Sequence, residues 1–258
     1  MLPPSQLVFS FGPSVDHPVL GARASRPPHE RTAAPRAQIL VLIRRRLLAL
    51  YGPQRPIERP DPIDQLINAI LSTKTRDEVS FPAFRRLLYR YKSWAAVIDA
   101  PIAEIARTIH GVTRHERKAE YISGALHTIV AQTGNLDLMF LQDWPEDTAM
   151  AWLMTLPGAG PKVAATTLNW SLLRKRVLAV DTHLLRVGQR LGLVPATADY
   201  AGGFEAFMRL VPAEWDADDL FEFHWLMKLH SQRLCAYEHP ACFRCPLRDH
   251  CAHNATRH

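Results

Sequence analysis

The sequence predicts an all-α protein. From residue 37 onward, apolar residues recur with helical spacing, as Ile39, Ile43 and Leu47 do. Proline and glycine fall between these periodic segments, where they end one helix and begin the next. One short apolar stretch, residues 177–180, is the single segment with the composition of a strand. With 258 residues and 47% hydrophobic content, the chain can form one large domain or two small ones.

The helices can be placed in chain order. The first covers residues 39–50 and exposes the three arginines at 44–46. Asp61 and Pro62 have the residue types of a helix N-cap and a first-turn proline, so a second helix is predicted over residues 63–71. Asp147 is placed to cap a later helix. The further predicted helices cover residues 77–91, 101–108, 115–132, 147–155, 161–173, 181–192, 203–210 and 217–233.

The beginning of the chain has a different character. Residues 1–36 contain many prolines and no periodicity, so we expect a disordered or flexible N-terminal extension. The first residues lack the basic start and apolar core of a secretory signal. No apolar run approaches the roughly 20 residues of a membrane helix. We therefore expect a cytoplasmic bacterial protein that acts near the nucleoid and has no membrane partner.

The charge favours a polyanionic partner. The formal net charge is +6, and residues 158–190 hold six basic residues against one acid, Asp181. Residues 199–222 reverse this balance, with seven acids against Arg209. A positive face beside a glycine turn suits a phosphate backbone. A solvated helix face would give the same composition, so the charge alone does not decide.

A glycine turn divides two of the predicted helices. Residues 156–170 read LPGAGPKVAATTLNW, and Pro161 suits the first position of the second helix. Glycine tolerates positive φ and lets another group approach the backbone closely. The helix also points its free N–H groups toward the turn, which attracts anions. Two interpretations stay open: Gly158 and Gly160 serve only the geometry of a helical hairpin, or they form a backbone cradle for phosphate.

All four cysteines fall in the last 24 residues, with the spacing C-x6-C-x2-C-x5-C. A disulfide framework is unexpected without a secretion signal. The cluster predicts a metal site, since four thiolates bind either zinc or an iron–sulfur cluster. Spacing by itself leaves the choice between these two open. The cysteines are Cys235, Cys242, Cys245 and Cys251.

These motifs together resemble the endonuclease III family of DNA-repair glycosylases. LPGAGPK, which ends at Lys162, is similar to the family's helix-hairpin-helix motif, and VDTH follows about 20 residues later. The cysteine spacing and the helix before it are also similar, so the resemblance covers roughly residues 37–251. It implies a six-helix domain with the hairpin over residues 55–174. Residues 37–54 and 175–258 would form an iron–sulfur cluster domain, with DNA between the two.

The resemblance also implies roles for single residues. Lys162 would attack the sugar C1′, and Asp181 would stabilise positive charge on the sugar or move protons. Gly158 and Gly160 would offer backbone N–H groups to one phosphate, without sequence preference. Lys74 stands where the family usually has glutamine, and it has three donors and no acceptor. The implied DNA contacts are Gly158, Gly160, Ser72, Lys74 and His183, and the implied [4Fe–4S] ligands are Cys235, Cys242, Cys245 and Cys251.

The implied activity is that of a bifunctional base-excision-repair DNA glycosylase/AP lyase, working through a lysine Schiff base and β-elimination. Its partner would be double-stranded DNA with oxidised pyrimidines or abasic sites, bound by a monomer. Two alternatives are a mismatch-type adenine or thymine glycosylase of the same fold and a non-catalytic DNA-binding module. A mismatch adenine glycosylase usually lacks the hairpin lysine and carries a glutamate near residues 71–74, and neither feature is present.

Overall fold

The computed structural model describes residues 38–255, and every regular element in that range is helical. This confirms the all-α prediction, whereas the predicted extension, residues 1–36, lies outside the described residues. None of the described helices is long and apolar enough to cross a bilayer. The α-helices are α1 (Ile39–Tyr51), α2 (Pro62–Ser72), α3 (Asp77–Tyr91), α4 (Trp94–Ile98), α5 (Ile102–Thr108), α6 (His115–Thr133), α7 (Glu146–Leu153), α8 (Pro161–Trp170), α9 (Thr182–Leu191), α10 (Tyr200–Met208), α11 (Ala217–Arg233) and α12 (Ala252–Ala255). Short 3-10 helices are η2 (Met139–Asp143), η3 (Cys242–Arg244) and η4 (Arg248–His250).

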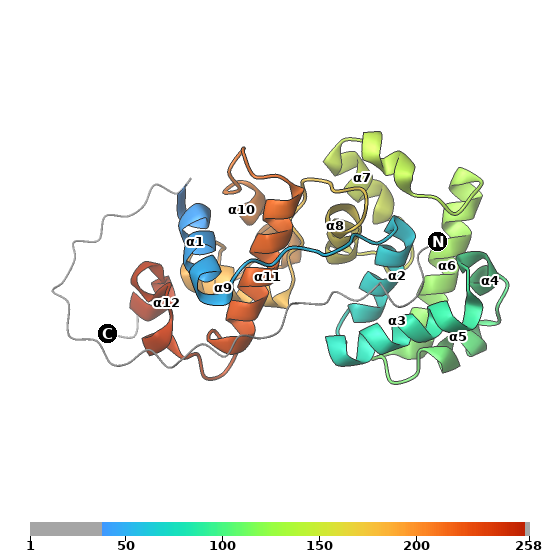
Figure 1. Ribbon diagram of the computed structural model, residues 1–258, viewed down its shortest axis with the longest axis horizontal. Helices are drawn as coiled ribbons and strands as arrows, with labels where there is room; N and C mark the ends of the chain where they lie inside the picture. Colours follow the sequence, from blue (N-terminus) through green and yellow to red (C-terminus); the bar gives the residue numbers. More distant parts are fainter. Residues whose placement is uncertain (1–37, 256–258) are drawn as a thin grey trace.

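The helices form two groups with separate cores. Helices α2 to α8 lie in one half of the molecule, and α1 lies with α9 to α12 in the other (Figure 1). The first helix therefore packs against α11, far from it in sequence. The predicted domain boundaries, 55–174 against 37–54 with 175–258, stay a proposal that the two cores support.

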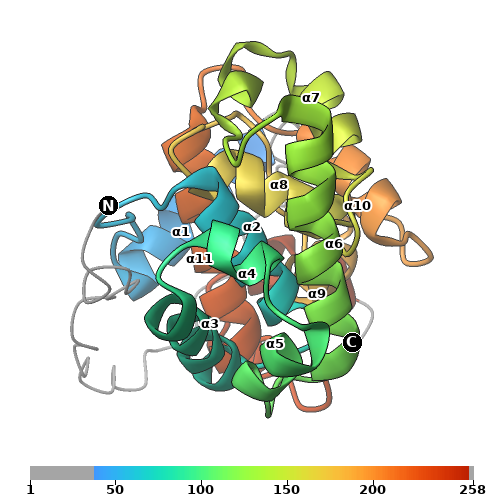
Figure 2. The ribbon, with the colours of Figure 1, turned by 90° about the vertical axis from the view of Figure 1, so that its right-hand side faces the viewer.

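Helix α2 lies at the centre of the larger group (Figure 2). Its N-terminus is capped as the sequence predicts, because Asp61 Oδ1 accepts a hydrogen bond from Ile63 N at 2.8 Å and Pro62 occupies the first turn. Nine of its eleven residues are buried, so it is covered on nearly all sides. It packs against α8, the helix that carries Lys162.

The structure corrects three local predictions. Residues 177–180 form no strand, because the described chain contains no second strand to pair with; the Ala179 carbonyl instead accepts a hydrogen bond from the His224 ring. Asp147 is not the N-cap of α7, which begins at Glu146 and leaves Asp147 in its first turn. Helix α8 ends at Trp170 rather than at residue 173.

Aromatic contacts and buried hydrogen bonds join the two groups. The ring of Trp170, at the end of α8, lies 5.6 Å from that of Phe221 and 5.3 Å from that of Trp225, both on α11. Asn169 Nδ2 donates at 2.9 Å to the carbonyl of Ala217, where α11 begins. Helix α11 is thereby fixed against α8, and both helices carry side chains of the site described next.

Candidate active site and cysteine pocket

The two glycines of the hairpin turn differ in structure. Gly158 has φ +80°, and a Cβ there would lie 2.8 Å from Cβ of Tyr121 on α6, so glycine is required for both conformation and packing. Gly160, the N-cap of α8, has an ordinary φ of −77°, and a Cβ there would meet nothing within 4 Å. Gly158 therefore serves geometry, and Gly160 leaves open space before a helix N-terminus, where an anion is attracted.

Lys162 lies in the first turn of α8, directly after Pro161. Its ammonium makes no hydrogen bond or ion pair with any residue that the structure describes. Burial lowers the pKa of Lys162, and the nearby Lys228 ammonium lowers it further, against the opposing effect of the Asp181 and Asp77 carboxylates. A lysine with a lowered pKa holds more of the free amine, which is the nucleophilic form.

Asp181 is the N-cap of α9. Its Oδ1 accepts hydrogen bonds from the backbone N of His183 and of Leu184, both at 2.9 Å. Burial acts to raise the pKa of Asp181, but its electrostatic interactions with His224, Lys162 and His183 and the hydrogen bond from the amide of Leu184 outweigh burial and hold the pKa below its usual value. Asp181 is therefore an ionised carboxylate at neutral pH, with Oδ1 fixed by the helix.

His224 on α11 lies behind Asp181. Its Nδ1 is 2.7 Å from the Ala179 carbonyl oxygen, so this nitrogen carries the proton and donates. Its Nε2 lies 3.9 Å from Asp181 Oδ2 and has no hydrogen-bond partner among the described residues. Burial lowers the pKa of His224 to about 4, so the ring is neutral. It packs edge-on to Trp170 at 4.8 Å and forms an uncharged wall of the site.

An ion pair between the two helix groups completes the charge arrangement. Lys228 Nζ on α11 lies 2.7 Å from Asp77 Oδ2 at the start of α3, and 4.4 Å from the ring centroid of Trp225. Both charges act on the pKa of Lys162. The sequence analysis missed this pair, because its members stand 151 residues apart and no motif contains them.

Lys118 on α6 joins the two loops that border the site, and the sequence analysis missed it as well. Its buried ammonium donates to the carbonyl oxygens of Leu71 (2.7 Å) and Thr73 (2.6 Å) and to Thr75 Oγ1 (3.0 Å). Thr75 Oγ1 also accepts a hydrogen bond from Thr113 N at 3.3 Å. The loop after α2 and the loop before α6 are thus held together. Burial lowers the pKa of Lys118 to about 8.

The other predicted DNA contacts have different surroundings. Lys74 is exposed in the loop after α2, with φ +52°, which is uncommon for a residue other than glycine. Ser72 Oγ donates to the Ala69 carbonyl at 3.0 Å, and His183 Nδ1 lies 2.9 Å from Ser231 Oγ. Lys74 can therefore extend toward a ligand, whereas Ser72 and His183 are engaged with the protein. Their contacts with DNA stay predictions.

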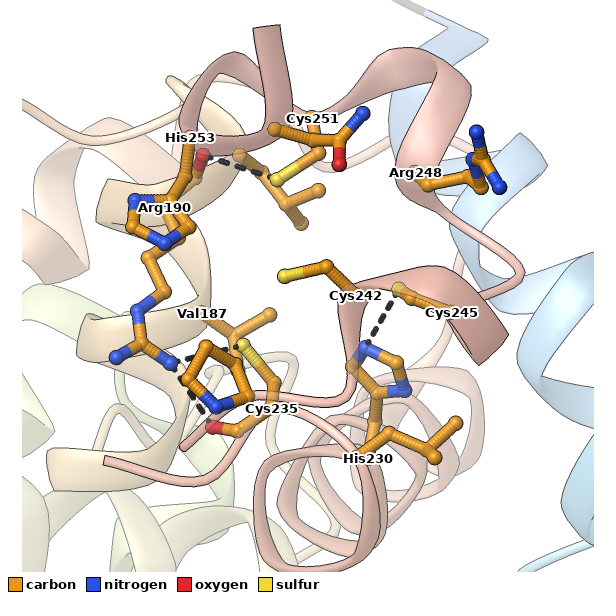
Figure 3. Close-up of a pocket in the computed structure, with 13 residues that line it drawn as sticks. Val187, Arg190, His230, Cys235, Cys242, Cys245, Arg248, Cys251 and His253 are labelled. Atoms are coloured by element: carbon orange, nitrogen blue, oxygen red, sulfur yellow. Dashed lines mark hydrogen bonds between the residues drawn. The ribbon is translucent and has the colours of Figure 1, made fainter. Parts of the chain in front are cut away.

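The four cysteines surround one pocket that follows α11 (Figure 3). Arg190 Nη1 donates to Cys235 Sγ at 3.3 Å, and the backbone N of Leu247 donates to Cys245 Sγ at 3.4 Å. Donors aimed at sulfur stabilise the thiolate form, which is the form that binds metal. The pocket thus brings the C-terminal loop that carries the cysteines together with α9, which is distant from it in sequence.

The donor set, four cysteine thiols around one pocket, fits a metal centre. No three His, Cys, Asp or Glu side chains of the described residues lie close enough to hold one ion. In a four-iron cluster each thiolate binds its own iron, so the four sulfurs stand farther apart than around one zinc. Burial raises the pKa of Cys245 to about 11, so a metal that binds this sulfur at neutral pH would displace its proton.

Comparison with known proteins gives related sequences over most of the chain. The family model described as HhH-GPD superfamily base excision DNA repair protein matches residues 67–213. Endonuclease III of Thermotoga maritima is 31% identical, covering 74% of this chain and 83% of that protein. Endonuclease III of Synechocystis sp. is 30% identical, covering 84% and 91%. The DNA glycosylase/AP lyase ROS1 of Arabidopsis thaliana is 28% identical, and the chain spans 13% of its length.

Solved structures show the same fold. A trapped covalent endonuclease III–DNA intermediate superposes with a TM-score of 0.71 at 23% identity, covering 86% of this chain and 98% of that one. A thermostable thymine-DNA glycosylase superposes with a TM-score of 0.69 at 20% identity, covering 86% and 97%. At these identities the likeness establishes the fold.

Proposed function

Because the chain belongs to the HhH-GPD superfamily of base excision DNA repair proteins and, within it, to the endonuclease III family of DNA glycosylase/AP lyases, we propose that it removes oxidised pyrimidines from duplex DNA and nicks the abasic strand. The observation that carries this proposal is Lys162. Its amine lies at the start of the hairpin helix without a partner among the described residues, its pKa is lowered, and a buried carboxylate is close enough to act on it.

The reaction begins on a base flipped out of the duplex. The neutral Lys162 amine forms a bond to C1′, and the electron pair of the C1′–N bond leaves with the base, which takes up a proton. The bound nitrogen then gives up one proton, and its electron pair forms the C1′–N double bond of an iminium as the ring oxygen leaves C1′ and takes up a proton. Loss of a C2′ proton breaks the C3′–O bond, and the phosphate group leaves, which nicks the strand.

Asp181 faces this chemistry as a carboxylate. Its lowered pKa keeps it ionised, so it can stabilise positive charge that develops on the sugar. It can also accept the proton that the Lys162 amine loses after attack. The hydrogen bonds from His183 N and Leu184 N hold one oxygen in place and leave the other for these tasks.

The DNA would lie across the hairpin turn and the loop that carries Lys74. Gly160 would leave room for a phosphate at the start of α8, and Ser72, Lys74 and His183 would approach the DNA around the flipped base. Lys74, which lacks an acceptor, would bias the choice of lesion. We further propose that the protein acts as a monomer in the bacterial cytoplasm.

The four cysteines would hold a [4Fe–4S] cluster. When bound, the cluster supplies a covalent link among Cys235, Cys242, Cys245 and Cys251, and this is a structural contribution. Arg190 would hold the chain at Cys235 through its bonds to the sulfur and to the Ala236 carbonyl. The loop would thereby be fixed on α9.

Borohydride trapping tests the proposal, because it reduces the iminium to a stable amine. Wild-type protein mixed with a duplex that carries one abasic site should give a covalent adduct on a denaturing gel. Lys162→Gln should give none while it still binds DNA, and Lys92→Gln, an exposed lysine at the end of α3, should trap as wild type does. Asp181→Asn should slow base release by about 10²-fold.

Other outcomes would identify the alternatives. Undiminished trapping in Lys162→Gln would assign the chemistry to another amine. The first candidates are Lys118 and Lys228, whose ammonium groups interact electrostatically with that of Lys162. Base release without any trapping or nicking would indicate an adenine or thymine glycosylase of the same fold. Binding to abasic DNA with neither activity would indicate a non-catalytic module.

A further inference from the structure

An open groove lies between α3 and α5, outside the site described above. The two helices pack side by side in the larger helix group (Figure 2). The groove is lined mainly by basic side chains: Arg85, Arg86, Arg90, Arg107 and His110, with Tyr89 beside them. None of these residues takes part in the proposed chemistry.

The positive charge of this groove is mostly uncompensated. Arg90 and Arg107 share one acid, Glu104, at 2.7 Å and 3.8 Å. Arg86 donates to two backbone carbonyl oxygens, which orients its guanidinium without neutralising it. Arg85 is exposed and has no ion pair with any described residue. Four guanidinium groups therefore meet a single carboxylate, which is a surface for a polyanion.

An exposed aromatic residue adds a second feature. Tyr89 is 74% exposed, and the Lys92 ammonium lies 4.1 Å from its ring centroid. A tyrosine hydroxyl can donate to a phosphate oxygen, and arginine does so with two parallel bonds. The groove thus offers donors of the types that bind the DNA backbone without reading its sequence.

One residue that lines the groove stands next in sequence to a loop that borders the site. This residue is His110, and the chain runs directly from His110 into the loop before α6. That loop is tied to the loop of Lys74 by the hydrogen bond from Thr113 N to Thr75 Oγ1. Arg114, exposed in the same loop with φ +55°, adds a further positive charge to that loop.

We propose that the α3–α5 groove binds the phosphate backbone of the DNA duplex that flanks the lesion. This inference rests on the proposed function, since it needs DNA in the site. The groove lengthens the contact beyond the flipped nucleotide and holds the duplex while the short-range chemistry takes place. It adds affinity that does not depend on sequence, and this affinity weakens as the salt concentration rises, because the counterions released on binding then gain less entropy.

Duplex length and salt test the inference. We would compare the double variant Arg85→Gln/Arg107→Gln with wild type. Arg86 and Arg90 are kept, because their hydrogen bonds join α3 to α5 and to the residues that follow it. Two abasic duplexes would be used, one with about half a helical turn on each side of the lesion and one with about one and a half turns. Dissociation constants would be measured across a salt series, and nicking rates at saturating protein.

The two duplexes should respond differently. On the long duplex the variant should bind more weakly. The plot of the logarithm of its association constant against the logarithm of salt concentration should be less steep, by about 0.9 for each lost phosphate contact, or about 1.8 for two. On the short duplex, affinity should be unchanged. Nicking at saturation should be unchanged on both. Arg45→Gln/Arg209→Gln, which removes the same charge from exposed positions of the other helix group, should reproduce none of this.

Each other outcome counts against the inference. Equal binding by wild type and the double variant on both duplexes, with normal nicking, overturns the groove as a DNA site and leaves the proposed function intact. An equal loss of affinity for the long duplex in the control variant assigns the effect to net charge and overturns the inference as well. A wild-type protein that binds neither duplex overturns both proposals together.

Discussion

At the scale of single residues, the reactivity of Lys162 depends on the charges around it. Burial disfavours its ammonium, and Lys228 disfavours it further, while Asp181 and Asp77 favour it. Lys228 and Asp77 also neutralise each other across a 2.7 Å ion pair. The pair therefore adjusts the fraction of free amine through the balance of its two charges.

Lys228→Gln should move the pH dependence of trapping to higher pH. The change removes a cation that lowers the Lys162 pKa and leaves the Asp77 carboxylate unpaired, which raises it. Both effects raise the pKa, so the free amine appears only at higher pH. At a fixed pH below both values, the trapping rate should fall about tenfold for each pKa unit, and at high pH it should recover. Trapping rates over a pH series measure this.

Asp77→Asn supplies the opposite control. It removes a carboxylate that raises the Lys162 pKa and leaves the Lys228 ammonium unpaired, so the profile should move to lower pH. If both variants shift the profile in the same direction, or lower the rate equally at every pH, the pair acts on structure and not on the Lys162 pKa.

The sequence could predict some of these residues and not others. Lys162 and Asp181 each belong to a short motif, and Asp181 opens the helix predicted over residues 181–192, where the structure has it as the N-cap of α9. Lys228, Asp77 and Lys118 belong to no motif. Their roles come from packing between distant helices, and a lysine on a helix looks the same in sequence whether it is solvated or paired.

At the scale of elements, the hairpin turn assigns separate tasks to its two glycines. Gly158 packs on Tyr121 of α6 with positive φ, and Pro157 packs on Gly124 one turn later. Gly160 touches no such neighbour and stands before the free N–H groups of α8. The two interpretations that the sequence left open thus apply to different residues, with the phosphate role still a proposal.

Gly160→Val should weaken binding to every DNA sequence alike while the fold survives. A side chain there finds open space in the protein and an allowed φ, but it would fill the position proposed for phosphate. Gly158→Ala should instead destabilise the protein by roughly 1–3 kcal/mol, because of its positive φ and the clash with Tyr121. Dissociation constants on several duplexes and thermal unfolding separate the two effects. Normal binding by Gly160→Val would mean that the turn is only a connection.

Element prediction succeeded where periodicity is long. Helices α2, α3 and α6 have eleven or more residues each, which is long enough for the helical spacing of apolar residues to be recognised in the sequence. Helices α4 and α12, with five and four residues, are too short for a period and were not predicted. The strand prediction for residues 177–180 is wrong. These residues are apolar because they are buried beside α11, and not because they pair with another strand.

At the scale of the whole molecule, the chain returns to its start. Helix α1 shares a core with α9 and α11, and Arg44 on α1 is hydrogen-bonded to the buried Glu222 on α11. Leu247, in the cysteine loop, belongs to the same core. Composition could predict a core of this size, but the joining of the first helix to the last third of the chain was available only through the family resemblance.

This arrangement predicts how loss of the metal would spread. We expect purified protein to contain iron and sulfide and to be yellow-brown, as thiolate-bound clusters are. Cys242→Ser should lose the iron, and because Leu247 anchors its loop in the smaller core, α1, α9 and α12 should exchange their amide hydrogens faster. Helices α2 to α6, which build the other core, should exchange as before. Hydrogen exchange on the variant and on chelator-treated wild type measures both. Stoichiometric zinc without iron or sulfide would contradict the cluster, and faster exchange throughout both cores would show that they unfold as one unit.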